Sequence, residues 1–212
     1  ANASPKGPLS VSRHTLAATG NTSFGYFGGG FPGPVSTVDR IDYSSDTGTT
    51  PTKGPLSLAR YDQAATGNAD FGYHGGGYAS TSISTVDRID YSSDTGTTPT
   101  KGPLSVARYG LAATGNTSFG YFGGGRAGSS LKSTVDRIDY SSDTGTTPTK
   151  GPLNFSQRNL AASSSQANAI TVGTLFSAPT IRDNVAPQGN DFGYFGGGYT
   201  GSDTSIVDRI DY

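Results

Sequence analysis

Residues 101–149 read KGPLSVARYGLAATGNTSFGYFGGGRAGSSLKSTVDRIDYSSDTGTTPT, and close copies of this stretch make up most of the chain. Its first segment, KGPLS or KGPLN, begins at Lys6, Lys53, Lys101 and Lys150, so successive copies start 47, 48 and 49 residues apart. Each copy then carries an FGYFGGG or FGYHGGG segment and a VDRIDY segment. Self-similarity at such a period predicts a repeat architecture.

Each repeat holds four short β-compatible stretches separated by turn residues, and no stretch has a helical period. In the third repeat we expect strands at 109–114, 119–122 and 133–140, and a weaker one at 146–149. Four short strands in about 48 residues are typical of a propeller blade. We therefore predict an all-β fold, a single β-propeller domain over 1–212 with four repeats at about 6–52, 53–100, 101–149 and 150–212.

The composition excludes several classes of protein. The 212 residues include 32 glycines but no cysteine, methionine or tryptophan, and the net charge is -1. Without cysteine there is neither a disulfide framework nor a thiolate metal site. A charge near zero gives no reason to expect a nucleic-acid partner, and no apolar stretch approaches the roughly 20 residues that a membrane-spanning helix needs.

The order of these motifs resembles the kelch repeat. In that family an arginine precedes the first strand, the second strand ends in a double glycine, and the third reads roughly V-E-x-Y-D, which V-D-R-I-D-Y resembles. Arg13, Arg60 and Arg108 match the arginine of the family, whereas the fourth repeat reads Ser156-Gln157-Arg158, so its arginine is shifted by one position. The tryptophan usual in the fourth strand is missing, which predicts a short or irregular outer strand.

The turn after VDRIDY, SSDTGTT, also resembles the Asp box of sialidase-like propellers, a structural hairpin between the third and fourth strands. The resemblance implies that the aspartate accepts hydrogen bonds from its own turn, and glycine there supplies a positive φ. The turn aspartates are Asp46, Asp94 and Asp143.

The start of the chain suggests how the ring closes. ANASPKGPLS aligns with GTTPTKGPLS, the turn and fourth-strand region of a repeat, whereas the last repeat stops at the third strand. We expect the N-terminal segment to supply the outer strand of the last blade, because closure removes unpaired sheet edges. Two chains sharing a larger ring, or an excerpt of a longer array, are the alternatives.

Several motifs could carry chemistry but have simpler structural interpretations. The GGG triplets lack the following helix that a phosphate-binding loop requires, so we expect close backbone packing. Four identical Asp-Arg alternations favour contacts between blades over one active site. The arginines concerned are Arg40, Arg88, Arg137 and Arg209.

Metal and cofactor sites are not predicted. His14 and His74 occupy non-equivalent positions, and His74 stands where the other repeats have phenylalanine. The turn aspartates lack the repeated acidic spacing of calcium loops.

The repeats differ most between GGG and VDRIDY, where related folds place binding loops. Variable loops on a constant scaffold commonly carry recognition, although drift in exposed linkers is the alternative. These loops open with Phe31, Tyr78, Arg126 and Tyr199, which we take as candidate binding residues. A second variable spot follows the conserved arginine, at His14-Thr15, Tyr61-Asp62 and Tyr109-Gly110.

The fourth repeat also carries an insertion at about 163–190, with the apolar stretch AITVGTLF. An extra hairpin, a cap buried as a plug over the ring, and a docking element for a neighbouring subunit are the alternatives for it.

These observations favour a non-enzymatic recognition or adhesion module with a carbohydrate or protein receptor as its partner. The chain also resembles the Gly-rich kelch-like arrays of phage and microbial proteins, and this resemblance implies an extracellular location or a place on a virion, such as a phage tail or fibre. A structural subunit of a filament is the alternative. A propeller glycosidase fits less well, because identical repeats do not supply a single catalytic constellation.

Overall fold

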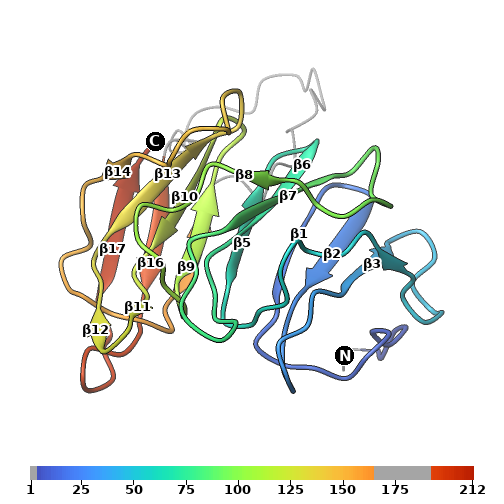
Figure 1. The fold of residues 1–212 in the computed structure, drawn as a ribbon, viewed down its shortest axis with the longest axis horizontal. Helices are drawn as coiled ribbons and strands as arrows, with labels where there is room; N and C mark the ends of the chain where they lie inside the picture. Colours follow the sequence, from blue (N-terminus) through green and yellow to red (C-terminus); the bar gives the residue numbers. More distant parts are fainter. Residues whose placement is uncertain (1–3, 165–191) are drawn as a thin grey trace, which may run out of the picture.

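The structure is a computed structural model that describes residues 4–164 and 192–212, and within these the chain forms strands and turns without any helix. Each repeat builds one antiparallel sheet, and the sheets follow one another in chain order (Figure 1). The all-β prediction is therefore confirmed. The insertion at 163–190 lies almost wholly outside the described residues.

The first three sheets have four strands each. They comprise β1 (Ala17–Gly20), β2 (Phe24–Gly28), β3 (Val38–Asp42) and β4 (Thr52–Lys53); β5 (Ala64–Gly67), β6 (Phe71–Gly75), β7 (Val86–Asp90) and β8 (Thr100–Lys101); β9 (Ala112–Gly115), β10 (Phe119–Gly123), β13 (Val135–Asp139) and β14 (Thr149–Lys150). A two-stranded hairpin, β11 (Arg126–Ala127) and β12 (Ser130–Leu131), follows GGG in the third repeat. The last sheet has three strands, β15 (Ala161–Ser164), β16 (Phe192–Gly196) and β17 (Val207–Asp211).

The first strand of a repeat starts later than its sequence suggests. We predicted 109–114 in the third repeat, whereas β9 begins at Ala112. Gly110 has a φ of 65°, and Thr15, Asp62 and Asn159 at the equivalent positions also have positive φ. A left-handed residue cannot continue an extended strand, so the backbone bends there before the strand begins.

Consecutive sheets pack face to face. The first strands β1, β5, β9 and β15 lie side by side in that order, and β1, β5 and β9 also pack against the second strand of the next sheet. The four sheets thus form a fan, with β1–β3 at one end and β15–β17 at the other (Figure 1). Among the described residues, no comparable packing joins β15 to β1, so the fan is open.

The N-terminal segment does not lie where we predicted. Residues 4–10 pack on the first repeat, where the Gly7 amide donates to the Asp46 carbonyl (2.7 Å) and the Thr50 amide donates to the Pro8 carbonyl (3.0 Å). The same contact joins Gly54 to Asp94 and Gly102 to Asp143. The segment therefore makes in the first repeat the contact that KGPLS makes in the second and third, and among the described residues β17 pairs only with β16.

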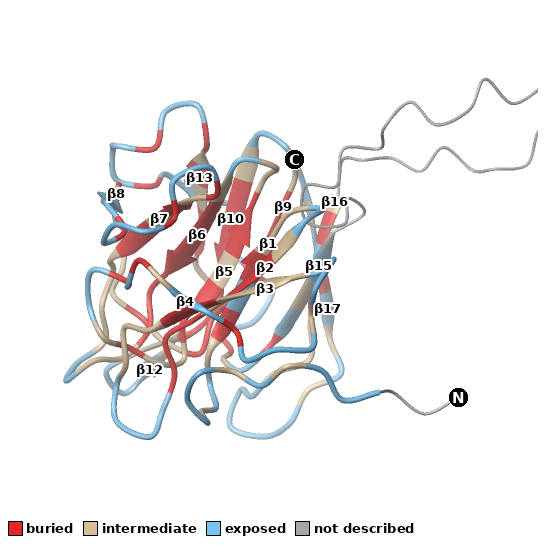
Figure 2. Ribbon diagram, turned by 90° about the vertical axis from the view of Figure 1, so that its right-hand side faces the viewer, coloured by how far each residue is buried: buried red, intermediate tan, exposed pale blue. Residues whose placement is uncertain are grey.

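The hydrophobic core is divided among the junctions between sheets. The first junction contains Tyr26, Val38, Leu56, Ile89 and Tyr91, and two similar clusters fill the next two junctions. Figure 2 shows buried residues along the strands of the first three sheets and exposed residues in the surrounding turns. Burial of apolar area is the main stabilising term, so each repeat depends on its neighbours.

A buried ion pair fastens the start of each of the first three repeats. Arg13 pairs with Asp39 (2.8 Å), Arg60 with Asp87 (2.9 Å), and Arg108 with Asp136 (2.7 Å). The guanidinium of Arg60 also donates to the His74 carbonyl (2.9 Å). Each arginine thereby holds the segment before the first strand against the second and third strands.

The fourth repeat differs at this point. Gln157 occupies the buried position, since its carbonyl accepts from the Gly125 amide just as the Arg60 carbonyl accepts from Gly30. Arg158 therefore does not replace the arginine of the other repeats, and it aligns instead with His14, Tyr61 and Tyr109, as the bridges below show.

Candidate binding face

The two variable spots of the sequence come together at one end of the sheets. The residue that opens each loop after GGG forms an antiparallel bridge with the residue that follows the buried arginine or glutamine. The four bridged pairs are His14–Phe31, Tyr61–Tyr78, Tyr109–Arg126 and Arg158–Tyr199. We call these eight side chains the aromatic strip.

Backbone hydrogen bonds hold every pair of the strip. The Phe31 amide donates to the His14 carbonyl and the His14 amide to the Phe31 carbonyl, both at 2.9 Å. Reciprocal bonds of 2.8–3.2 Å join the other three pairs. The φ values of the last two glycines, +68° and +121° at Gly29 and Gly30, turn the chain into this bridge, and such φ values favour glycine. The GGG triplets therefore serve backbone geometry, as expected.

The rings of the strip contact one another from the first repeat to the third. Centroids lie 5.4 Å apart for His14–Phe31, 5.3 Å for Phe31–Tyr61, 5.5 Å for Tyr61–Tyr78 and 5.2 Å for Tyr78–Tyr109. Edge-to-face and tilted pairs at such distances are favourable. The result is a continuous row of five rings that crosses the first two junctions between repeats.

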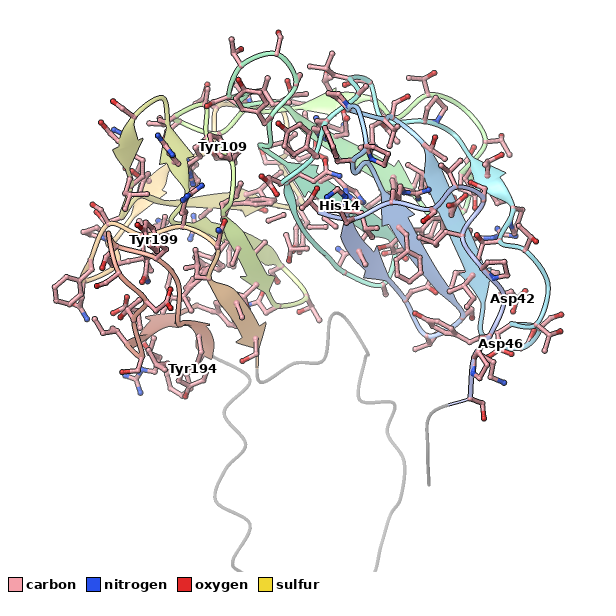
Figure 3. The ribbon with its side chains drawn as sticks, turned by 90° about the horizontal axis from the view of Figure 1, so that it is seen from below. His14, Asp42, Asp46, Tyr109, Tyr194 and Tyr199 are labelled. Carbon is pink, nitrogen blue, oxygen red and sulfur yellow. The ribbon has the colours of Figure 1, made fainter. Side chains whose placement is uncertain are left out.

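The side chains of the strip remain accessible to solvent although their rings contact one another. Phe31 and Tyr199 are exposed by 38% and 39%, and the tyrosines between them are half-buried. Figure 3 looks toward this end of the sheets and labels His14, Tyr109 and Tyr199 on three of them. Partial burial raises the pKa of Tyr61 above its usual range, and neighbouring Tyr78 and Asp62 add to the effect.

The far end of the strip is cationic. The Arg158 guanidinium lies 5.6 Å from the centre of the Tyr199 ring, and the Arg126 Nε donates to the Gly128 carbonyl (2.8 Å). Arg158, Tyr199 and Asp203 line a depression of about 360 Å³. This end therefore combines an aromatic face with both signs of charge.

A second depression, of about 210 Å³, lies beside the strip. It is lined by the left-handed residues Thr15, Asp62, Gly110 and Asn159, joined in a ladder because each amide donates to the preceding carbonyl at 2.7–3.0 Å. Burial raises the pKa of the Asp62 carboxyl, against the opposing effect of Arg158 and His14. The depression thus presents carboxylate, amide and hydroxyl groups next to the aromatic row.

The third-strand arginines and the turn aspartates lie outside the strip, and two of these arginines join one repeat to the next. Arg40 donates to Asp94 and Arg88 to Asp143, both at 2.8 Å. Arg137 lies over the Phe119 ring, and Arg209 pairs with Asp211 on the surface. None of these arginines belongs to the strip.

The turn aspartates do not act as the Asp-box resemblance implied. Asp94 and Asp143 each accept from a tyrosine and an arginine of the preceding repeat and pair with the lysine that begins their own repeat, and Asp46 pairs with Lys6 (3.2 Å). The last residue of the third strand stabilises the turn instead: the Asp42 carboxylate accepts from the Ser44 amide (2.9 Å) and hydroxyl (2.6 Å). Asp90 and Asp139 do the same, and these hydrogen bonds lower the pKa of all three carboxyls.

His74 is fully buried, and neither of its ring nitrogens has a hydrogen-bond partner among the described residues. Its ring packs over Gly28, as Phe122 packs over Gly75 and Phe195 over Gly123. Burial lowers the pKa of His74 to about 3. It takes the place of a phenylalanine, and in the described parts of the chain no cluster of three possible metal ligands of the His, Cys, Asp or Glu type is present.

Sequence reasoning identified both variable spots but did not pair them. The signal was available, because both spots change from repeat to repeat while the residues on either side stay constant. What the sequence alone could not show was the left-handed backbone after Tyr61 and Tyr109, which brings the two spots side by side.

Comparison with known proteins adds no relative. No protein-family model matches the chain, and no curated protein matches it.

Proposed function

We propose that this protein is a non-enzymatic recognition module of the β-propeller type, built of kelch-like repeats, that binds carbohydrate along the aromatic strip. The observation that carries the proposal is the row of five contacting rings, beside a depression lined with polar groups. The strip collects the positions at which the repeats differ, on a scaffold that is otherwise constant.

The chemistry of the strip suits a sugar better than a charged ligand. The faces of tyrosine and phenylalanine are apolar and slightly negative, so they accept the C–H face of a pyranose ring. The hydroxyl groups of the sugar would find Asp62, Asn159 and Asp203 in the two depressions. Binding sites commonly combine an apolar surface with a few placed polar groups in this way.

The propeller assignment rests on four consecutive antiparallel sheets that pack in chain order through their first strands. A propeller arranges such sheets around an axis, and the ladder of Thr15, Asp62, Gly110 and Asn159 would lie beside it. A module of this kind acts outside cells or on a virion surface, where a carbohydrate or protein receptor is met.

A filament subunit is the second candidate, and one observation favours it. The two ends of the fan expose surfaces that are buried between the other repeats, with Tyr43 exposed by 54% at one end and Val207 by 63% at the other. A propeller glycosidase has less support, because the strip contains no paired acidic groups of the kind that glycoside hydrolysis uses.

The test is glycan-array binding of the full chain, its Tyr78→Ala and Tyr199→Ala variants, and the double variant. Tyr78 contacts a ring on either side, so its loss opens a gap in the row. We expect Tyr78→Ala to weaken binding about tenfold or more, as for a central aromatic anchor, and the double variant to abolish it.

Phe155→Ala is the matched control, because Phe155 is an aromatic residue exposed by 52% that is not part of the strip. This control should bind as the parent does. Equal loss in the control and in Tyr78→Ala, or no glycan binding by the parent, would reject the proposal. Far-ultraviolet circular dichroism of each variant checks that the sheets are retained.

A further inference from the structure

Each repeat meets the next one through the same pair of surfaces. At the first junction, Tyr26 stacks on Tyr91 with ring centroids 4.9 Å apart, and its hydroxyl donates to Asp94 (2.9 Å). Arg40 donates to the same carboxylate (2.8 Å), and Thr19 and Tyr91 share a hydrogen bond of 2.9 Å between their hydroxyls. Two apolar rings and one charge cluster therefore define the junction.

The second junction repeats this arrangement. Tyr73 stacks on Tyr140 at 4.9 Å, and Asp143 accepts from Tyr73 (2.9 Å) and Arg88 (2.8 Å). The third junction keeps the stack, Tyr121 on Tyr212 at 5.1 Å. At the first two junctions, one side of a repeat supplies the second-strand tyrosine and the third-strand arginine, and the other side supplies the partner ring and the turn aspartate.

The fourth repeat leaves the first of these sides uncovered. Tyr194 is exposed by 39% and Val207 by 63%, whereas their counterparts Tyr26 and Val38 are fully buried. The side chain of Arg209 is exposed by 53%, against 23% for Arg40. We call this surface the outgoing face; it consists of Tyr194, Gly196, Val207 and Arg209.

Gly196 shows how open this face is. At Gly28, Gly75 and Gly123 an added Cβ atom would lie 2.7–2.8 Å from the ring of the following repeat. At Gly196 the nearest atom is the Val207 Cγ2 at 3.4 Å, within its own sheet. Among residues 4–164 and 192–212, no atom occupies the space that a ring fills at the three junctions.

The first repeat leaves the complementary side uncovered. Tyr43 is exposed by 54%, whereas Tyr91 and Tyr140 are exposed by 8% and 7%. The Asp46 side chain is exposed by 28%, against 7% for Asp94. We call this surface the incoming face; it consists of Leu9, Phe27, Tyr43 and Asp46.

On the incoming face, Asp46 already forms the lysine ion pair that Asp94 forms in the first junction. Lys6 holds Asp46 at 3.2 Å, the same separation as between Lys53 and Asp94 in the complete junction. The carboxylate of Asp94 takes two further donors, Tyr26 and Arg40, so Asp46 has room for a tyrosine and an arginine. The outgoing face offers both, in Tyr194 and Arg209.

We propose that the outgoing face of one copy binds the incoming face of a second copy, head to tail. Tyr43 then stacks on Tyr194, Asp46 accepts from Tyr194 and Arg209, Phe27 packs over Gly196, and Leu9 covers Val207. Within one chain Tyr194 and Asp46 lie at opposite ends of the fan (Figure 3). A heterologous contact of this type links identical chains in series or closes them into a ring.

A second copy is the partner that fits these surfaces. The outgoing face carries the exposed Arg209, whose ion pair is with Asp211 of its own strand, and the incoming face carries Asp46, which pairs with Lys6. One face therefore offers an arginine and the other an aspartate, so neither face is complementary to itself. Their shapes match because the same residue types already pack against each other at two junctions inside the chain. The proposal does not depend on what the aromatic strip binds.

The experiment is sedimentation velocity of the 212-residue chain over about a hundredfold range of concentration, since association follows mass action. We expect the mean mass to rise with concentration. Tyr43→Ala removes a ring from the incoming face, and Gly196→Leu fills the space for Phe27 on the outgoing face. Each variant alone should remain monomeric.

Mixing the two variants gives the decisive result. The intact outgoing face of Tyr43→Ala can bind only the intact incoming face of Gly196→Leu, so an equimolar mixture should form a one-to-one complex. A parent chain that stays monomeric throughout, or variants that each assemble as the parent does, would overturn the proposal. Urea unfolding of each variant alone establishes that it is folded, and the Phe155→Ala variant should associate like the parent.

Discussion

The second and fourth sheets have nearly the same strands and very different surroundings. β6 and β16 differ only in His74 against Phe195, and β7 and β17 are identical in sequence. Yet Val86 is fully buried and Val207 is exposed by 63%, and Tyr73 is buried where Tyr194 is exposed by 39%. The environment of a strand in this molecule is set by the adjacent repeat and hardly at all by its own residues.

The buried polar groups differ as well. In the second repeat Arg60 and Asp87 form an ion pair with no solvent exposure of either side chain. In the fourth, Gln157 takes the arginine position and Asp208 accepts from Asn154 at 2.5 Å. One repeat thus depends on a charged pair that the other replaces with neutral partners.

The largest change in the free energy of unfolding should follow when the second repeat receives the glutamine that the fourth repeat has at the buried arginine position. Arg60→Gln leaves the buried Asp87 carboxylate with only Ser57 as its partner, and removing one member of a buried pair costs about 3–5 kcal/mol. Urea unfolding measures the loss. Arg209→Gln, which breaks an exposed ion pair, should lower the free energy of unfolding by less than about 1 kcal/mol. Equal losses in the two variants would show that the burial of the ion pair does not determine its contribution to stability.

A smaller difference should separate two glycines at equivalent positions. Gly75→Ala forces a methyl group to within 2.7 Å of the Phe122 ring, and overpacking of this kind costs about 1–3 kcal/mol. At Gly196→Ala the added methyl group has no described neighbour closer than 3.4 Å, so this substitution should change the free energy of unfolding by less than about 0.5 kcal/mol. The pair is compared at low protein concentration, and similar losses in both would contradict the open outgoing face.

The smallest effect at neutral pH concerns His74, the residue that distinguishes β6 from β16. His74→Phe removes two buried nitrogens without partners and should stabilise the protein by about 1 kcal/mol at pH 7.

The gain should grow in acid. The folded pKa of His74 is about 3, below the ordinary value near 6.5, so the unfolded chain binds the proton first and the parent loses stability as the pH falls from 6.5 toward 3. By pH 5 the variant should have gained about 2 kcal/mol more. His14→Gln is the control, because His14 is exposed; a pH-independent difference between parent and His74→Phe would refute the assignment.

The sheets could be predicted from the sequence because every strand recurs beside the same turn residues. The strand starts could not, because the left-handed backbone at Asp62 and Gly110 has no common side chain to indicate it. Asp94 was expected to stabilise its own turn, and its real partners, Tyr26 and Arg40, lie in another repeat. Contacts between repeats depend on how the sheets stack, which the pattern within one repeat does not encode.

The candidate site was predicted in part. Phe31, Tyr78, Arg126 and Tyr199 were named as loop residues, and the structure adds a bridged partner to each. The ring contacts that join Phe31 to Tyr61 and Tyr78 to Tyr109 cross from one repeat to the next, so no reading of a single repeat could have found them.

The bridges of the strip have a consequence for how such a protein changes over generations. Each pair is held through amide and carbonyl groups, and every residue type except proline supplies both. Histidine, tyrosine and arginine already occupy the same place in different repeats. The side chains of the strip can therefore be substituted one pair at a time without loss of the fold. Each duplicated repeat would add one more pair that can vary independently under selection.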